Sequence, residues 1–120
     1  MLRTGIDLIE IERVRSMIER YGARFLERVF TQQEIAELGD NIASLAGRFA
    51  VKEAVAKALG TGIGVVAWRE IEILRGPRRE PVLYLHGEAA RLADQLGLQE
   101  WSVSISHTPT HAVGLAVALK

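Results

Sequence analysis

The stretch from Gly47 to Gly64, GRFAVKEAVAKALGTGIG, limits the fold more than any other, because it predicts a long helix with a packed side. At about 100° per residue, its apolar side chains fall on one arc. Glu53 lies inside that arc, and Lys57 follows one turn later at its edge. A carboxylate that faces the interior is costly unless it is paired. The arc consists of Ile42, Leu45, Ala46, Phe49 and Ala56.

The opposite edge of this arc and the end of the helix carry groups suited to a ligand. Arg48 and Lys52, one turn apart, line that edge. Gly60, Gly62 and Gly64 then end the helix. Because glycine has no Cβ and tolerates positive φ, the backbone there can approach a ligand closely. The sequence therefore predicts a helix with flanking basic groups that runs into a glycine-rich loop.

The other segments alternate between strand and helix patterns. Glu70 and Glu72 alternate with isoleucines, which predicts a strand with one solvent-exposed face. The last strand pairs large residues with small ones, so a neighbour, most simply the long helix, packs closely on its small side. Strands are predicted at 4–9, 69–74, 82–85, 101–107 and 112–119, and helices at 11–21, after Thr31 and after Gly87.

These patterns predict the α+β class: a largely antiparallel sheet packed on one long helix, in a single domain over residues 1–120. Fifteen basic and fifteen acidic side chains give no net charge, which argues against a nucleic-acid partner held by phosphate neutralisation. The absence of cysteine excludes disulfides and thiolate metal sites. With no signal peptide or membrane span in the sequence, we expect a cytoplasmic protein without a membrane partner.

Asp7 is a second acid with apolar neighbours, in the first predicted strand. Asp is disfavoured in strands, so it either satisfies a nearby backbone amide or binds a ligand. Two carboxylates buried on different elements are costly unless a cation joins them, and oxygen ligands favour a hard ion such as Mg²⁺, which usually also binds substrate phosphate. A lone histidine at a strand end is more often structural than a ligand. The groups available to hold phosphates are Arg48, Lys52, Lys57 and His107.

A second feature lies on the helix at 11–21 and continues past Gly22. Its side chains combine positive charge with exposed apolar surface, which suits the docking of an acidic, partly apolar helix. The alternative is a solvated basic face with Phe25 in the core. The stripe consists of Arg13, Met17, Arg20, Arg24 and Phe25.

Six blocks in order resemble the holo-acyl-carrier-protein synthases, the small bacterial type of 4′-phosphopantetheinyl transferase. GRFAVKEAVAKALGTGIG resembles the most specific block of that family. The others are GIDLIEIERV, RVFTQQEI, WREIEI, the run from Pro81 to Ala89, and SVSISHT. The resemblance covers nearly the whole chain.

The resemblance implies transfer of the 4′-phosphopantetheine arm from coenzyme A to a serine of an apo acyl carrier protein, with release of adenosine 3′,5′-bisphosphate. It implies Mg²⁺ bound by Asp7 and Glu53, which with Lys57 form the catalytic set, and a homotrimer with active sites between subunits. It leaves open which group removes the serine proton. The arginine stripe matches the family's carrier-docking helix. The implied coenzyme-binding residues are Arg48, Lys57 and His107, together with Gly62 and Gly64 of the loop.

The chain departs from the family pattern at two turns. Arg3 stands where the family often has glycine, and Arg79 or Glu80 replaces the glycine before the hairpin proline. An alternative function is a non-catalytic module that binds coenzyme A or a nucleotide, although Lys57 beside Glu53 argues against it. A third is a magnesium-dependent nucleotide hydrolase.

Overall fold

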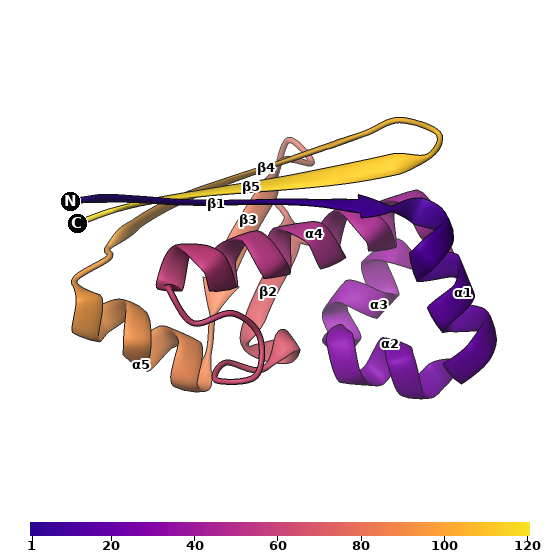
Figure 1. The fold of residues 1–120 in the computed structure, drawn as a ribbon, viewed down its shortest axis with the longest axis horizontal. Helices are drawn as coiled ribbons and strands as arrows, with labels where there is room; N and C mark the ends of the chain where they lie inside the picture. Colours follow the sequence, from indigo (N-terminus) through magenta and orange to yellow (C-terminus); the bar gives the residue numbers. More distant parts are fainter.

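The chain folds around α4, the helix that the sequence predicts to dominate (Figure 1). In the computed structural model, which describes residues 1–120, a three-stranded sheet covers one side of α4 and a two-stranded hairpin lies behind it in this view. The two termini lie side by side at one end of the larger sheet. In chain order the elements are β1 (Leu2–Glu10), α1 (Ile11–Tyr21), α2 (Ala23–Val29), α3 (Gln32–Leu38), α4 (Ile42–Leu59), the 3₁₀ helix η1 (Trp68–Glu70), β2 (Ile71–Arg75), β3 (Pro81–Leu85), α5 (Gly87–Leu96), β4 (Glu100–His107) and β5 (His111–Leu119).

The two sheets confirm the predicted class of antiparallel strands packed on one long helix. The larger has the order β1-β5-β4 and the smaller pairs β2 with β3, all antiparallel. In the larger sheet Asp7 lies opposite Gly114, which lies opposite Ile105. The sequence did not predict the division into two sheets, nor α2, which Gly22 separates from α1 with a φ of 58°.

Close approach of glycines sets how α4 crosses the larger sheet. A Cβ on Gly114 would overlap the backbone of α4, and a Cβ on Gly5 would overlap the Ala54 carbonyl. Near the start of the helix, a Cβ on Gly47 would lie 2.6 Å from the Ile105 Cγ2. The helix therefore runs from β4 over β5 to β1. The prediction that the small side of β5 packs on α4 is confirmed.

Side chains on almost every side of α4 are buried, whereas the helical phasing predicted burial of one apolar arc only. One core cluster lies between α4, the two sheets and α5, and a second lies between α4 and the helices α1–α3. Because layers cover both sides of the helix, only a narrow strip stays accessible, on which Glu53 is half-buried and Lys57 exposed. Glu53 is thus only half-buried, although Leu45, Ala46, Phe49 and Ala56 of its arc are buried. No helix of the fold has both the length and the apolarity needed to cross a membrane.

Strand β2 differs from its predicted pattern of one buried and one solvent-exposed face. Glu72 is only 7% exposed, because α3 packs over this face of β2. Its carboxylate accepts a hydrogen bond from the Thr31 hydroxyl at 2.5 Å and lies 3.0 Å from the His86 Nε2. Alternation alone cannot reveal that a helix distant in sequence covers the polar side.

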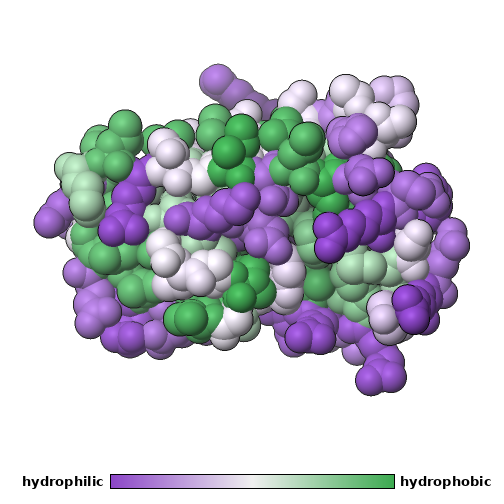
Figure 2. Space-filling model, viewed as in Figure 1, coloured by the Kyte–Doolittle hydropathy of each residue, from purple (hydrophilic) through white to green (hydrophobic).

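The outer face of the larger sheet has no layer over it (Figure 1). Its β1 and β5 residues are apolar and exposed: Ile6 is 60%, Leu8 67% and Leu115 39% accessible. Figure 2 shows hydrophobic side chains along the upper side of the molecule, where this sheet lies. An uncovered apolar sheet face of this kind is typical of a surface that contacts another protein.

Candidate active site

The candidate active site lies where α4 passes the edge strand β1. The Lys57 Nζ donates to the Ile6 carbonyl at 2.8 Å and lies 3.3 Å from the Asp7 Oδ1. Glu53, one turn before Lys57, is close enough to Asp7 for the two carboxylates to repel each other electrostatically. The structure therefore brings together the three residues that the sequence predicted as the catalytic set.

The approach of β1 to α4 explains why these groups meet. Because strand residues alternate between faces, Asp7 points to the same side as Gly5, the side that packs against α4. The tight contact of Gly5 with Ala54 holds that side against the helix, beside Glu53. The Asp7 side chain is 21% exposed and that of Lys57 is 52% exposed. The acids are thus held by packed elements but open to a ligand.

The electrostatics of the site leave Glu53 short of compensating charge. Partial burial, and after it the Asp7 carboxylate, raise the pKa of Glu53, while Lys57 and Arg13 oppose the change. A partly buried carboxylate whose ionisation is opposed by a neighbouring acid is typical of a functional site that can bind a cation.

The donor set suits Mg²⁺. It consists of two carboxylates from different elements, and no group of three or more acidic or histidine side chains in the fold is arranged so that it could hold a metal ion. Magnesium is commonly bound through one or two carboxylates while water and substrate phosphates fill the other positions. Asp7 and Glu53 therefore fit the ion that the sequence predicted.

The other residues predicted to bind coenzyme lie at different distances from the acid pair. Gly62 and Gly64 follow α4 beyond its cap at Gly60 and have φ of 71° and 126°, which explains glycine at these positions. His107 lies at the end of β4, level with Ile9 but two strands away. It lines a depression of about 290 Å³ with Ile11, Arg15, Ala43, Thr108 and Pro109. The chain alone does not bring His107 to the acids.

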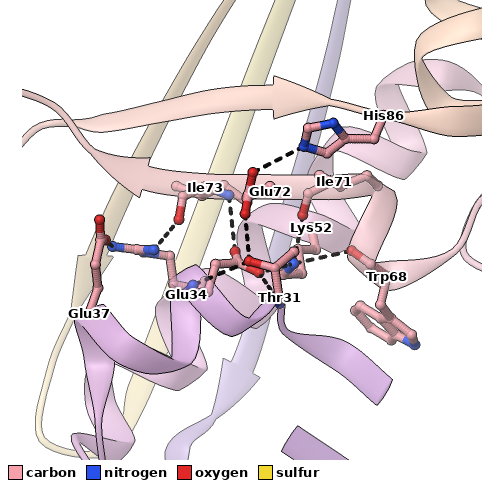
Figure 3. Close-up of polar contacts among 10 residues, drawn as sticks. Thr31, Glu34, Glu37, Lys52, Trp68, Ile71, Glu72, Ile73 and His86 are labelled. Carbon is pink, nitrogen blue, oxygen red and sulfur yellow. Dashed lines mark hydrogen bonds and ion pairs between the residues drawn. The ribbon is translucent and has the colours of Figure 1, made fainter. Parts of the chain in front are cut away.

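Arg48 and Lys52 do not face the acid pair, contrary to the prediction that they flank it and hold phosphates. Arg48 is 4% exposed and donates to the Ile73 carbonyl and to Glu37. Lys52 is fully buried and donates to Glu34 at 2.8 Å and to two backbone carbonyls (Figure 3). Both cations have a structural role in this chain. The phasing of α4 was right, but the layer of α3 and β2 that covers this side could not be read from it.

A groove lies beside the predicted docking stripe, between α1, α2 and η1. It encloses about 480 Å³, and its floor is a row of aromatic rings. The Phe49 ring lies 4.5 Å from that of Trp68 and 6.3 Å from that of Phe25. We call it the aromatic groove; its lining includes Met17, Arg24, Phe25, Arg28, Phe49 and Trp68.

The structure divides the docking stripe into three parts. Met17, Arg24 and Phe25 line the aromatic groove, and Phe25 is 8% exposed, so it belongs to the core as well. Arg20 stacks on the ring of Tyr21 at 5.5 Å. Arg13 lies close enough to influence Glu53 and so connects the stripe to the acid pair. A ligand that follows the stripe would arrive at the candidate active site.

Sequence reasoning did not assign Arg28, Phe49 or Trp68 to this surface. Arg28 lies one turn after Arg24 on α2, and extending the stripe by one turn would have found it. Phe49 was assigned to the apolar arc of α4 only. Trp68 comes from a 3₁₀ helix that no periodicity indicates, and only the tertiary structure brings it to Phe49.

Comparison with known proteins gives consistent matches along nearly the whole chain. A model of the 4′-phosphopantetheinyl transferase superfamily matches residues 3–116. A holo-[acyl-carrier-protein] synthase of Herpetosiphon aurantiacus is 46% identical over 126 residues, covering 99% of each chain. That of Moorella thermoacetica is 49% identical over 122 residues, covering 99% of this chain and 93% of its own. The structure of the Helicobacter pylori synthase in complex with coenzyme A is similar with a TM-score of 0.89 and 35% identity, over 97% of this chain and 99% of that one.

Proposed function

The chain belongs to the 4′-phosphopantetheinyl transferase superfamily, and from this premise we propose that it converts apo acyl carrier protein to the holo form. The reaction transfers the 4′-phosphopantetheine arm of coenzyme A to a serine hydroxyl. The serine O–H bond breaks and its proton passes to a base. The serine Oγ forms a bond to the β-phosphorus, the bond from that phosphorus to the bridging oxygen breaks, and adenosine 3′,5′-bisphosphate leaves with that oxygen. The observation that carries this proposal is the meeting of Asp7, Glu53 and Lys57 at the seam of β1 and α4.

Asp7 and Glu53 are the residues that would hold Mg²⁺. When bound, the ion supplies positive charge that offsets the negative charge of the diphosphate and of the transition state. The two carboxylates orient that charge because one is fixed on a strand and the other on a helix. Partial burial, and after it the charge of Asp7, raises the pKa of Glu53, which supports a cation between the two acids.

Lys57 is the basic group best placed to assist. Its ammonium is held by the Ile6 carbonyl and by Asp7, so it remains beside the acids while its exposed half is free to contact a phosphate. A positioned ammonium donates charge-assisted hydrogen bonds to phosphate oxygens and stabilises the charge of the leaving group. Gly62, Gly64 and His107 remain proposed coenzyme contacts. Arg48 is one only by resemblance, since its guanidinium is already bonded within the fold.

We assign the aromatic groove and its arginines to the carrier protein. Arg13, Arg20, Arg24 and Arg28 are exposed on α1 and α2, around an apolar floor. This combination suits an acidic helix that carries one large apolar side chain, because charge complementarity steers the partner and the groove accepts the side chain. Arg13 would then bring the partner's serine towards the acid pair.

A homotrimer with active sites between subunits is supported by the uncovered sheet face. The exposed Ile6, Leu8 and Leu115 form an apolar surface that a second subunit would bury. Asp7 points to the opposite side of the same strand, but β1 is the edge strand of the sheet. A subunit that packs on the outer face and extends past this edge would therefore adjoin the acid pair. His107, which the chain does not bring to its own acids, would contact a coenzyme bound at such an interface.

The experiment that tests the function is mass spectrometry of an apo acyl carrier protein incubated with the protein, coenzyme A and Mg²⁺. A mass gain of one phosphopantetheine arm is expected. Tight binding of coenzyme A without a mass gain would instead indicate a non-catalytic binding module. Release of phosphate or of pantetheine phosphate without a carrier would indicate a hydrolase. The cytoplasmic location stays a prediction, and we also propose a role in fatty-acid biosynthesis.

A further inference from the structure

The buried pair of Glu34 and Lys52 is a feature that the proposed chemistry does not use. Both side chains are fully buried, and their charged atoms lie 2.8 Å apart. Burying two charges costs several kcal/mol per ion in general, and replacing such a pair by apolar residues is often neutral or stabilising. The stability of the fold alone therefore does not account for an ion pair at this position.

Every bond of the Lys52 ammonium goes to a different part of the fold (Figure 3). It donates to the Glu34 Oε1 on α3, to the Trp68 carbonyl in η1 at 3.1 Å, and to the Ile71 carbonyl at the start of β2 at 2.6 Å. An ammonium has three N–H donors, so all three are used. Glu34 in turn accepts from Thr31 N at 2.9 Å and Ile73 N at 3.0 Å.

The two carbonyl bonds fix both ends of η1, and η1 carries one wall of the aromatic groove. The Trp68 ring leans on Phe49 with a centroid distance of 4.5 Å, and Phe49 stacks on Phe25. Phe49 lies three residues before Lys52 on α4. One side chain thus sets the position of Trp68 relative to the helix that supplies the next ring of the groove.

We infer that Lys52, held by Glu34, is a positioning residue for carrier recognition: it fixes Trp68 against Phe49 and so keeps the aromatic groove open to an apolar side chain of the acidic partner helix. This inference rests on the proposed function. Lys52 itself touches neither the partner nor the coenzyme, because it is completely buried. Its neighbour Glu53 belongs to the accessible strip of α4, which faces β1. Loss of the pair therefore changes recognition of the carrier more than the chemical step.

The test is a double variant, Glu34→Gln with Lys52→Met. Glutamine retains the helix-capping geometry at position 34, methionine fills the space of the lysine stem, and no buried charge is left unpaired. We expect the KM for the carrier to rise about tenfold, with kcat and the KM for coenzyme A changed by less than about twofold. The matched control is Leu98→Ala, which removes buried apolar contacts far from the groove and should lower stability without changing the carrier KM.

A second readout follows Trp68 directly. In a Trp101→Phe background Trp68 is the only tryptophan, and the Trp101 Nε1 has no hydrogen-bond partner to lose. In the double variant, the fluorescence emission of Trp68 should shift to longer wavelength, and acrylamide should quench it more strongly because the side chain is more accessible. Neither change is expected in Leu98→Ala. A merely structural ion pair would leave both the emission and the carrier KM unchanged once folding is accounted for.

Three outcomes overturn the inference: an unchanged carrier KM, an equal rise in the Leu98→Ala control, or an equal rise in the KM for coenzyme A. Should the double variant not fold, Glu34→Gln with Lys52→Gln, which keeps amide donors near Trp68, is measured instead, and the same three outcomes apply. If the unmodified protein transfers no phosphopantetheine, the proposed function itself fails. If it does and the variant behaves like the control, only this inference fails.

Discussion

Replacing Glu53 by glutamine separates function from stability, because the two should change in opposite directions. The carboxylate is half-buried and makes no hydrogen bond within the chain, while Asp7 repels it. Glutamine has the same shape without the charge. We therefore expect Glu53→Gln to fold as well as the original protein or slightly better, and to lose transfer activity at least about 100-fold.

The size of the stability change follows from the pKa of Glu53. Burial and Asp7 raise it above 4.5, the ordinary value. An acid with a raised pKa binds its proton more tightly in the folded state, so its ionised form lowers stability above the folded pKa and has no such effect below the unfolded pKa. Solvent screens this partly exposed group, so the gain on substitution should be at most about 1 kcal/mol near neutral pH and should vanish below about pH 4.

Chemical denaturation between pH 4 and pH 8 measures this difference, and mass spectrometry of the carrier measures transfer. Mg²⁺ at 100 times its Kd should add about 2.7 kcal/mol to the stability of the original protein and much less to that of the variant. The matched control is Glu100→Gln, an exposed acid on β4, which should alter neither property. Strong destabilisation of Glu53→Gln with full activity per folded molecule would refute the assignment of Glu53 as a metal ligand.

Four other predictions test the packing, the assembly, the docking surface and the buried acid. Gly5→Ala places a methyl group against the Ala54 carbonyl, so urea denaturation should show a loss of about 3 kcal/mol, and near-original stability would contradict the close packing of β1 on α4. Leu115→Arg puts a charge on the uncovered sheet face, so light scattering should show a monomer that has lost activity; a fully active monomer would contradict sites between subunits. Arg24→Glu reverses one charge at the aromatic groove, so the KM for the carrier should rise at least about tenfold at low salt and less at high salt. The KM for coenzyme A should not change. An equal rise at both salt concentrations would argue against an electrostatic contact. Burial raises the pKa of Glu72, but hydrogen bonds from Thr31 and His86 outweigh burial and lower the pKa below 4.5. The ionised acid therefore stabilises the fold above that pH, and this contribution is lost as the pH falls. Glu72→Gln should make the free energy of unfolding depend less on pH in the acid range, and an unchanged dependence would show that the acid contributes nothing there.

The sequence predicted the acid pair because both acids broke a local rule. Asp7 stands in a strand, where aspartate is disfavoured, and Glu53 stands in the most apolar helix of the chain. Residues that contradict their local pattern are often functional, so each pointed to a ligand independently of the fold. The structure brings the two together at the seam of β1 and α4.

The same reasoning placed Arg48 and Lys52 beside the acid pair, but in the structure they face another layer, although they lie on the same helix. Helical phasing gives the direction of a side chain but not the layer that it meets. The layer on that side contains Glu34 and the carbonyls of β2 and η1, which are distant in sequence. These acceptors bind both cations and remove them from the solvent.

The sequence alone therefore determined the periodic elements, their caps and the acids that violate their surroundings, because propensity, alternation and capping act over a few neighbouring residues. Only the tertiary structure decided which cations remain free, that Glu72 is buried, that Trp68 meets Phe49, and that one face of the larger sheet has no layer over it. Each of these depends on contacts between residues far apart in the chain, and no local pattern encodes which element covers a given face.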